Sequence, residues 1–174
     1  MLEKKMQDAL NDQINAELYS GYLYLAMSAW FDDIDMPGFS GWMQIQAQEE
    51  LAHAMGFVNY VKERGGRVIL KAIEEPQVSW DSPEDAFSAA LEHEKYITGR
   101  ISSLVDIAIE LRDHATNNFL QWYVAEQVEE EASAEEILAK LKMAPEGSGV
   151  MMMLDREMGS RTFHVPSILG GEGD

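Results

Sequence analysis

The stretch FSAALEHEKYITGRISSLVDIAIEL, residues 87–111, indicates the fold class of this chain. Its inward positions recur at alternating steps of three and four residues, the spacing of a helix that buries one stripe against neighbouring helices. The stripe has one charged member, and it comprises Phe87, Ala90, Glu94, Ile97, Ile101, Leu104, Ala108 and Leu111. Just before it, Ser82-Pro83-Glu84-Asp85 has the composition of a helix N-terminus, so we expect a long helix that begins there.

Three other long segments carry the same three-four spacing, at about residues 5–33, 39–60 and 116–141. The second of them is followed by Gly65-Gly66, a common signal for the end of a helix. A weaker apolar pattern over 150–158 indicates one short helix more. The sequence therefore predicts an all-α fold, a four-helix bundle with a short fifth helix.

The connection at residues 67–81 breaks the helical spacing and contains Pro76. At ~3.3 Å per extended residue it can span ~50 Å, whereas a 27-residue helix is only ~40 Å long. It can therefore cross the whole bundle and start the third helix at the opposite end. We expect one domain over residues 1–158 and a C-terminal tail over 159–174.

The composition is strongly acidic, with 31 Asp and Glu against 13 Lys and Arg and a formal net charge of −18. Such a chain repels nucleic acid and anionic membranes and attracts cations, so neither a nucleic acid nor a membrane is an expected partner. No segment approaches the ~20 apolar residues of a membrane span. The N-terminus lacks an apolar signal core, and we expect a cytoplasmic protein. Because the chain has no cysteine, oxygen and imidazole groups must hold any metal.

Polar side chains interrupt all four predicted stripes near the middle of each helix. Ionised glutamates are rarely buried without a partner, and no Lys or Arg lies in these stripes. Two divalent cations would balance the four carboxylates. For any one residue a protonated carboxyl or a hydrogen-bonded core histidine is an equal alternative, but six together favour a two-metal site. The six are Glu17, Glu50, His53, Glu94, Gln127 and Glu130.

The spacings Glu50-x-x-His53 and Gln127-x-x-Glu130 each place two side chains on one helix face. Sites rich in carboxylates with one histidine suit iron or manganese, and zinc also binds them. A tightly held di-metal cofactor would have a second Glu-x-x-His pair, where this chain has Gln127 and Glu130. One position should thus be weaker, and we expect iron to pass through the site.

Tyr24 lies two turns after Glu17 on the same helix face. Its ring either packs in the core or serves the site, by orienting a ligand or by supplying an electron. Three acidic residues flank the stripes on the second and fourth helices. These residues are Glu49, Glu126 and Glu129. They form either a solvated acidic surface or a third cation position. His93 and His114 are expected at the surface.

Five segments together resemble the prokaryotic non-haem ferritins, over residues 1 to about 158. They are LNDQINAELYSGYLYLAMSAWF (10–31), QAQEELAHAMGF (46–57), RGGRV (64–68), LEHEKYIT (91–98) and NFLQWYVAEQVEEEAS (118–133). The resemblance implies a ferritin-like bundle with an internal di-iron centre. It also implies a shell of about twenty-four chains that oxidises Fe²⁺ with O₂ or H₂O₂ and stores ferric mineral. Members differ in how openly the chains pack, and the tail after Met158 lies outside the shared pattern.

The resemblance also implies roles for single residues. Glu17, Glu50 and His53 would hold one iron. The other would be held by Glu50, Glu94 and Glu130, with Gln127 nearby. Tyr24 matches the site tyrosine of the family. The third iron site of several prokaryotic members is matched by Glu49, Glu126 and Glu129, with Glu130 bridging to it.

Three neighbouring interpretations remain as alternatives. Bacterioferritins use a second Glu-x-x-His and a haem-ligating methionine where this chain has Leu51, so no haem is expected. A rubrerythrin-like di-iron peroxidase would also need the second Glu-x-x-His. Such proteins commonly carry a cysteine-bound iron as well, which a chain without cysteine cannot build. A metal-free helical scaffold would keep its function, and gain stability, when Glu50 and His53 are replaced by apolar residues.

Overall fold

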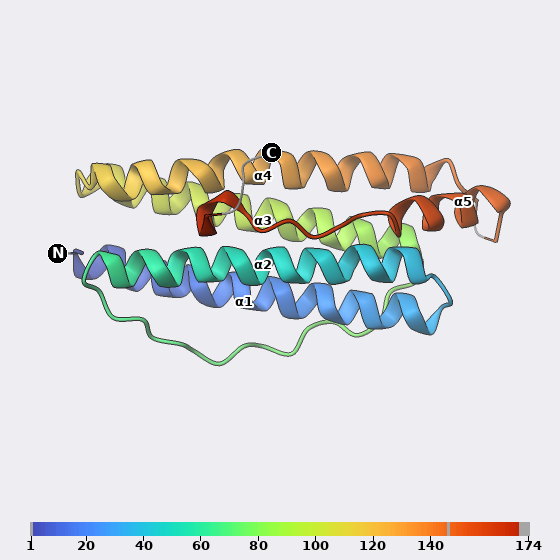
Figure 1. The fold of residues 1–174 in the computed structure, drawn as a ribbon, viewed down its shortest axis with the longest axis horizontal. Coiled ribbons are helices and arrows are strands. Elements are labelled where there is room, and N and C mark those ends of the chain that lie inside the picture. Colours follow the sequence, from blue (N-terminus) through green and yellow to red (C-terminus); the bar gives the residue numbers. More distant parts are fainter. Residues whose placement is uncertain (1, 146, 171–174) are drawn as a thin grey trace.

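The computed structural model describes residues 2–145 and 147–170, and every regular element within them is a helix. Four long helices lie side by side (Figure 1). They are α1 (Lys4–Asp33), α2 (Pro37–Glu63), α3 (Pro83–Glu110) and α4 (His114–Lys142). A short helix α5 (Gly149–Met158) and a 3₁₀ turn η1 (Ser167–Leu169) follow. The predicted all-α fold, a four-helix bundle with a short fifth helix, is confirmed.

The starts of α3 and α4 are fixed by side-chain caps. The Ser82 hydroxyl accepts a hydrogen bond from the backbone N–H of Asp85 at 3.1 Å, as its position before Pro83 predicts. At the start of α4 the Asp113 carboxylate accepts from the N–H of Thr116, also at 3.1 Å. Arg64, just after α2, donates two hydrogen bonds to Asp113 and so ties the end of α2 to this cap.

Helix α5 caps the start of α2 with a carboxylate from outside the helix. Asp155 Oδ1 accepts hydrogen bonds from the backbone N–H groups of Gly38 at 2.9 Å and Phe39 at 3.0 Å. A Cβ on residue 38 would lie only 1.7 Å from the backbone oxygen of Asp155. Glycine at this position therefore permits the close approach that holds α5 against the bundle.

The connection between α2 and α3 runs along the outside of α1 for most of the length of the bundle (Figure 1). Asn11 of α1 holds it, since its side-chain amide donates to the carbonyl of Arg67 at 3.0 Å and accepts from the N–H of Ile69 at 2.7 Å. At the far end, Phe87 of α3 lies against Phe39 at the start of α2, with ring centroids 5.6 Å apart. The predicted long crossover is thus confirmed.

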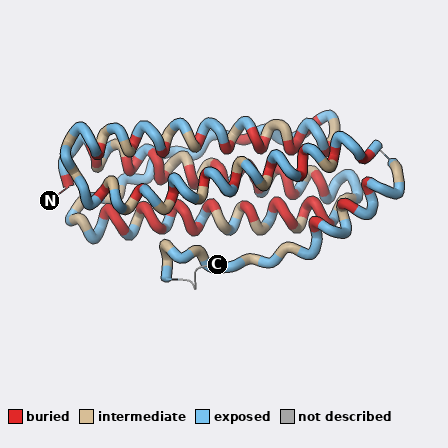
Figure 2. The backbone as a smooth tube through the Cα atoms, turned by 90° about the horizontal axis from the view of Figure 1, so that it is seen from above, coloured by how far each residue is buried: buried red, intermediate tan, exposed pale blue. Residues whose placement is uncertain are grey.

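The apolar core is divided into two clusters along the bundle. One lies toward α5 and includes Phe31, Phe39 and Phe87. The other lies toward the N-terminus and includes Phe57 and Leu120. Buried residues line the inner faces of all four helices (Figure 2). On each long helix, the polar residues of the predicted metal site lie between the residues of one apolar cluster and those of the other. The bundle therefore has a buried polar layer between the two clusters.

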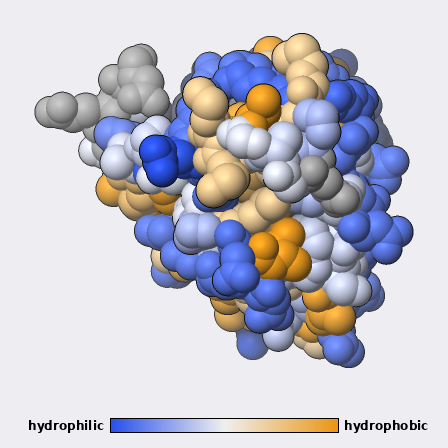
Figure 3. Space-filling view, turned by 90° about the vertical axis from the view of Figure 1, so that its right-hand side faces the viewer, coloured by the Kyte–Doolittle hydropathy of each residue, from blue (hydrophilic) through white to orange (hydrophobic). Residues whose placement is uncertain are grey.

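Among the described residues, no helix is long and apolar enough to cross a membrane. The end of the bundle that carries α5 shows apolar side chains at its surface among polar ones (Figure 3). The exposed apolar residues of α5 and of the segment leading to it are Met143, Val150, Met152 and Met153.

Candidate metal centre

All four long helices contribute to the buried polar layer. Each of the six side chains predicted for the two-metal site is buried, and none is more than 8% exposed: Glu17 on α1, Glu50 and His53 on α2, Glu94 on α3, Gln127 and Glu130 on α4. The helical spacing therefore placed these residues on the correct faces. The structure brings them into one region of the bundle.

Glu17, Glu50 and His53 form the tightest group in this layer. One potential ligand atom from each lies within 4.8 Å of the others. His53 Nδ1 lies 3.4 Å from Glu50 Oε2. Within the described residues, Glu17 Oε2 and His53 Nε2 are buried and have no hydrogen-bond partner. Buried polar atoms are nearly always satisfied, so these two atoms are suited to hold a cation.

Glu94 is oriented by hydrogen bonds from two other helices. The Tyr24 hydroxyl on α1 donates to Glu94 Oε1. The Gln127 amide on α4 donates to Glu94 Oε2 at 3.1 Å and to the backbone oxygen of Glu94 at 3.3 Å. Tyr24 is thus both a packed core residue and a contact of the site.

Two glutamines that were not singled out from the sequence support the glutamates. Gln13 donates to Glu17 Oε1 at 2.7 Å. Gln46 donates to Glu130 Oε2 at 2.8 Å and to Glu50 Oε1 at 3.3 Å. Each glutamine precedes a stripe glutamate by four residues, which is one helical turn on the same face. A search for polar residues at that spacing would have found both.

Burial strongly disfavours the charged forms of these carboxyl groups. It raises the pKa of Glu17 to about 8, and the charge of neighbouring Glu50 adds to this shift. Burial is also the largest cause of the raised pKa values of Glu50, Glu94 and Glu130. No lysine or arginine in residues 2–145 and 147–170 forms an ion pair with any of the four. A bound cation would favour ionisation and reverse these shifts.

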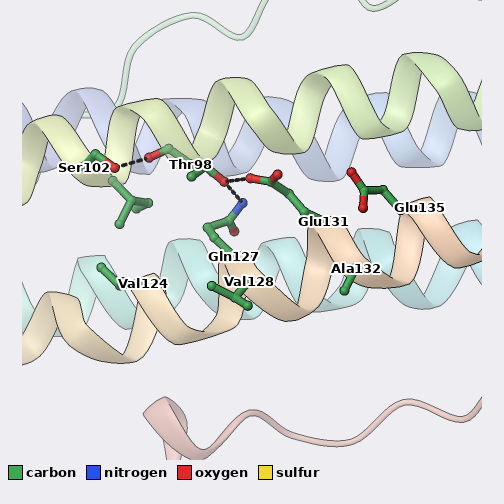
Figure 4. Close-up of a pocket in the computed structure, with 9 residues that line it drawn as sticks. Thr98, Ser102, Val124, Gln127, Val128, Glu131, Ala132 and Glu135 are labelled. Atoms are coloured by element: carbon green, nitrogen blue, oxygen red, sulfur yellow. Dashed lines mark hydrogen bonds between the residues drawn. The ribbon is translucent and has the colours of Figure 1, made fainter.

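Gln127 also lies between the buried polar layer and the surface groove that runs between α3 and α4. Its amide lies 3.4 Å from the Thr98 hydroxyl, which donates to Glu131 at 2.5 Å (Figure 4). These residues line a groove of about 340 Å³ that also includes exposed Val124 and Val128. Gln127 separates this groove from Glu94.

The three acidic residues considered for a third cation position lie around one pocket of about 420 Å³: Glu49, Glu126 and Glu129. A ring nitrogen of His53 and one carboxylate oxygen each of Glu126 and Glu130 come within 4.8 Å of one another. The pocket therefore adjoins the polar layer. Part of its remaining wall comes from the segment after α5, including Arg161 and His164.

The expected surface position of His93 is wrong. Its ring is partly buried between Tyr19 and Tyr96, and its Nε2 lies 2.7 Å from the Ser20 hydroxyl. Burial lowers the pKa of His93 to about 4. The helical angle directs this side chain away from the central stripe, but α1 lies beside α3 there and covers it. His114 is exposed, as predicted.

The sequence family described as ferritin-like domain matches residues 7–144. The chain belongs to the ferritin family. It is 40% identical to a bacterial non-heme ferritin of Bacteroides fragilis over 161 residues, covering 92% of this chain and 100% of that protein. It is 36% identical to a bacterial non-heme ferritin of Staphylococcus aureus, with 94% of this chain and 98% of that protein covered. The resemblance to prokaryotic non-haem ferritins is thus confirmed.

Solved ferritin structures have the same fold. The open pore ferritin of the archaeon Archaeoglobus fulgidus is 54% identical to this chain, with a TM-score of 0.92. The match covers 93% of this chain and 100% of the A. fulgidus chain. An engineered closed form of the A. fulgidus ferritin is 55% identical, also with a TM-score of 0.92, over 94% of this chain and 99% of that one. These relationships support iron storage as the function of this ferritin.

Iron suits the side chains of the polar layer. Carboxylate oxygens with a single imidazole form a mixed oxygen and nitrogen donor set, which first-row divalent metals such as iron accept. The unsatisfied Glu17 Oε2 and His53 Nε2 belong to the same layer. In this ferritin the residues present therefore fit iron as the bound cargo.

Proposed function

We propose that this ferritin oxidises Fe²⁺ at a di-iron centre in the buried polar layer and stores the ferric product. The observation that carries the proposal is the group of four buried carboxyl groups without a Lys or Arg partner among the described residues. Leaving several such groups ionised without a counter-charge would cost many kcal/mol. Two Fe²⁺ ions supply the missing positive charge.

The family resemblance implies a division of the ligands, and the close group of Glu17, Glu50 and His53 supports its first half. Glu17 and His53 hold the first iron, Glu94 and Glu130 hold the second, and Glu50 lies between them as the bridge. Gln127 and Tyr24 act on the second iron through their hydrogen bonds to Glu94. A third cation position is formed by Glu49, Glu126 and Glu129, next to Glu130.

The reaction draws one electron from each Fe²⁺. With dioxygen, two Fe²⁺ and two protons give two Fe³⁺ and hydrogen peroxide, and with hydrogen peroxide as oxidant they give two Fe³⁺ and two waters. The chain's part is to hold the two ions together in a site closed to bulk water. Tyr24 orients Glu94, so that this carboxylate faces the second iron in a fixed position.

Several copies of the chain would form the store, as a shell of about twenty-four subunits in the cytoplasm. The exposed methionines and valine around α5 are suited to packing against other copies. A net charge of −18 attracts Fe²⁺ to such a shell.

The test compares Fe²⁺ oxidation by the wild-type chain, by Glu50→Gln and by the matched control Glu63→Gln. Glu63 is an exposed residue on the same helix. Because Glu50 bridges both ions, we expect Glu50→Gln to slow oxidation at least about tenfold while the particle size stays unchanged. The control should oxidise iron at the wild-type rate. Equal rates in all three proteins would refute the proposal. Running the assay with O₂ and with H₂O₂ identifies the oxidant.

A further inference from the structure

The segment after α5 lies along α2 and α4 (Figure 1). Arg161 attaches the start of this segment to α2. Its guanidinium donates to Gln46 Oε1 at 2.8 Å and to Glu49 Oε2, and it lies 4.4 Å from the ring centroid of Trp42. Arg161 is 24% exposed and Glu49 17% exposed at the side chain, so this ion pair is partly shielded from water.

A second attachment holds the other end of the segment. The Trp122 indole N–H donates to the Ser167 hydroxyl at 2.9 Å. Ile168 packs beside Gly56 of α2, where an added Cβ would come within 3.2 Å of the Ile168 side chain. Residues 162–166 are therefore attached to the bundle at both ends. Together with Arg161 and Ser167, this segment lines one side of the acidic pocket of about 420 Å³.

Arg161 lines this pocket and binds Glu49, one of the three carboxylates of the proposed third cation position. A guanidinium stays charged at all accessible pH values, so it competes with any metal ion for the Glu49 carboxylate. The same guanidinium also bonds Gln46 Oε1, while the amide nitrogen of Gln46 donates to Glu130. Movement of Arg161 would thus free Glu49 and loosen the orientation of Gln46 beside the di-iron centre.

We propose that residues 161–169 form a gate over the third cation position, closed by Arg161 on Glu49 and opened when a cation displaces this guanidinium. The proposal rests on the proposed function, since it concerns an iron position beside the di-iron centre. When the gate opens, the carboxylates of Glu49, Glu126 and Glu129 can bind the ion, and residues 162–166 lose their attachment at one end. The segment 161–169, and His164 with it, then becomes free to move away from the pocket.

The test titrates the full chain with Co²⁺, by calorimetry, in the wild type and in Arg161→Gln. Arg156→Gln, which changes an exposed arginine on α5, is the matched control. We expect two binding phases from the di-iron centre in all three proteins. A third, weaker phase should become at least about tenfold tighter in Arg161→Gln alone, because its competitor has been removed. Glu49→Gln should abolish the third phase.

Hydrogen exchange supplies a second readout that does not depend on oxidation activity. In the wild type, amides of residues 162–169 should exchange faster once Co²⁺ fills the third position, and in Arg161→Gln they should exchange fast from the start. An unchanged third phase in Arg161→Gln overturns the gate. So does a tightened third phase without faster tail exchange in the wild type, since Arg161 is then only a fixed counter-ion. Absence of the first two phases refutes the di-iron proposal instead, and the gate is then judged by whether Co²⁺ accelerates tail exchange.

Discussion

Gln46 on α2 donates its side-chain amide to Glu130 on α4 at 2.8 Å, across the polar layer. Its amide oxygen accepts from Arg161 at 2.8 Å, which sets the orientation of the amide. One neutral residue thus links a buried carboxyl group of the candidate metal centre to the C-terminal tail. Loss of a hydrogen-bond partner that orients a metal ligand typically costs about 10–100-fold in metal affinity or activity.

Replacing Gln46 with methionine should weaken cation binding by about tenfold, because Glu130 loses the donor that positions it. The substitution keeps the length of the side chain and removes its polar atoms. Gln48→Met, at an exposed position of the same helix, is the control and should bind as the wild type does. Calorimetric titration with Co²⁺ measures the difference. Equal affinities for the two variants would show that Gln46 has no positioning role.

Tyr24→Phe should oxidise Fe²⁺ more slowly than the wild type. The phenyl ring fills the same buried space, while Glu94 loses one of its two side-chain hydrogen bonds. A hydrogen bond to a charged group contributes about 1.5–3 kcal/mol, so we expect a rate loss of at least about tenfold. Stopped-flow absorbance of ferric formation checks this, with Tyr22→Phe at an exposed position of α1 as the control. A wild-type oxidation rate in Tyr24→Phe would show that the Tyr24 hydroxyl has no role in the reaction.

The cation-free chain should lose stability as the pH rises. The pKa of Glu17 is about 8 in the folded chain against an ordinary value of 4.5, so the folded state binds the extra proton between these values. The free energy of unfolding therefore falls as pH increases through this window, by several kcal/mol at most. The raised pKa values of Glu50 and Glu130 act in the same direction.

Thermal unfolding at pH 6 and pH 8.5 in metal-free buffer measures this effect. Glu17→Gln should reduce the difference in Tm between the two pH values, because the amide cannot ionise. Added Co²⁺ should also reduce it, since a bound cation stabilises the ionised carboxylates. A Tm that rises with pH in the metal-free wild type would contradict the burial of uncompensated carboxyl groups.

Gly38→Ala should detach α5 from the bundle. The new Cβ would lie 1.7 Å from the backbone oxygen of Asp155, and the two hydrogen bonds to the Asp155 carboxylate would break. Loss of such a cap costs about 0.5–2 kcal/mol. Gly41→Ala is the control, because nothing lies within 4 Å of its added Cβ. Hydrogen exchange of residues 151–158 should accelerate in Gly38→Ala only. Protection equal in both variants would contradict the docking role of Gly38.

The periodic part of the structure could be read from the sequence. The three-four spacing on α3 isolates Glu94 among apolar residues, and in the structure Glu94 is buried between the two core clusters. The long crossover could be predicted from the length of residues 67–81 alone, because an extended chain covers more distance per residue than a helix. These features depend on local geometry that repeats along the chain.

Other features depend on contacts between distant segments. His93 is partly buried because α1 lies beside α3, and the helical angle of one helix cannot show this. The tail lies outside the sequence pattern shared with the family, yet η1 forms there and Arg161 pairs with Glu49, 112 positions earlier in the chain. Gln13 and Gln46 did carry a local signal, at four residues before a stripe glutamate, but the contact of Gln46 with Glu130 on α4 becomes evident only when the helices are assembled.

The central claim is tested most directly by anaerobic titration of the apoprotein with Fe²⁺ followed by air, with particle size determined in parallel. We predict tight binding of about two Fe²⁺ per chain within a large particle, and fast ferric absorbance that saturates at that ratio when air is admitted. Oxidation no faster than that of Fe²⁺ in buffer, with no tight binding, would contradict the di-iron centre.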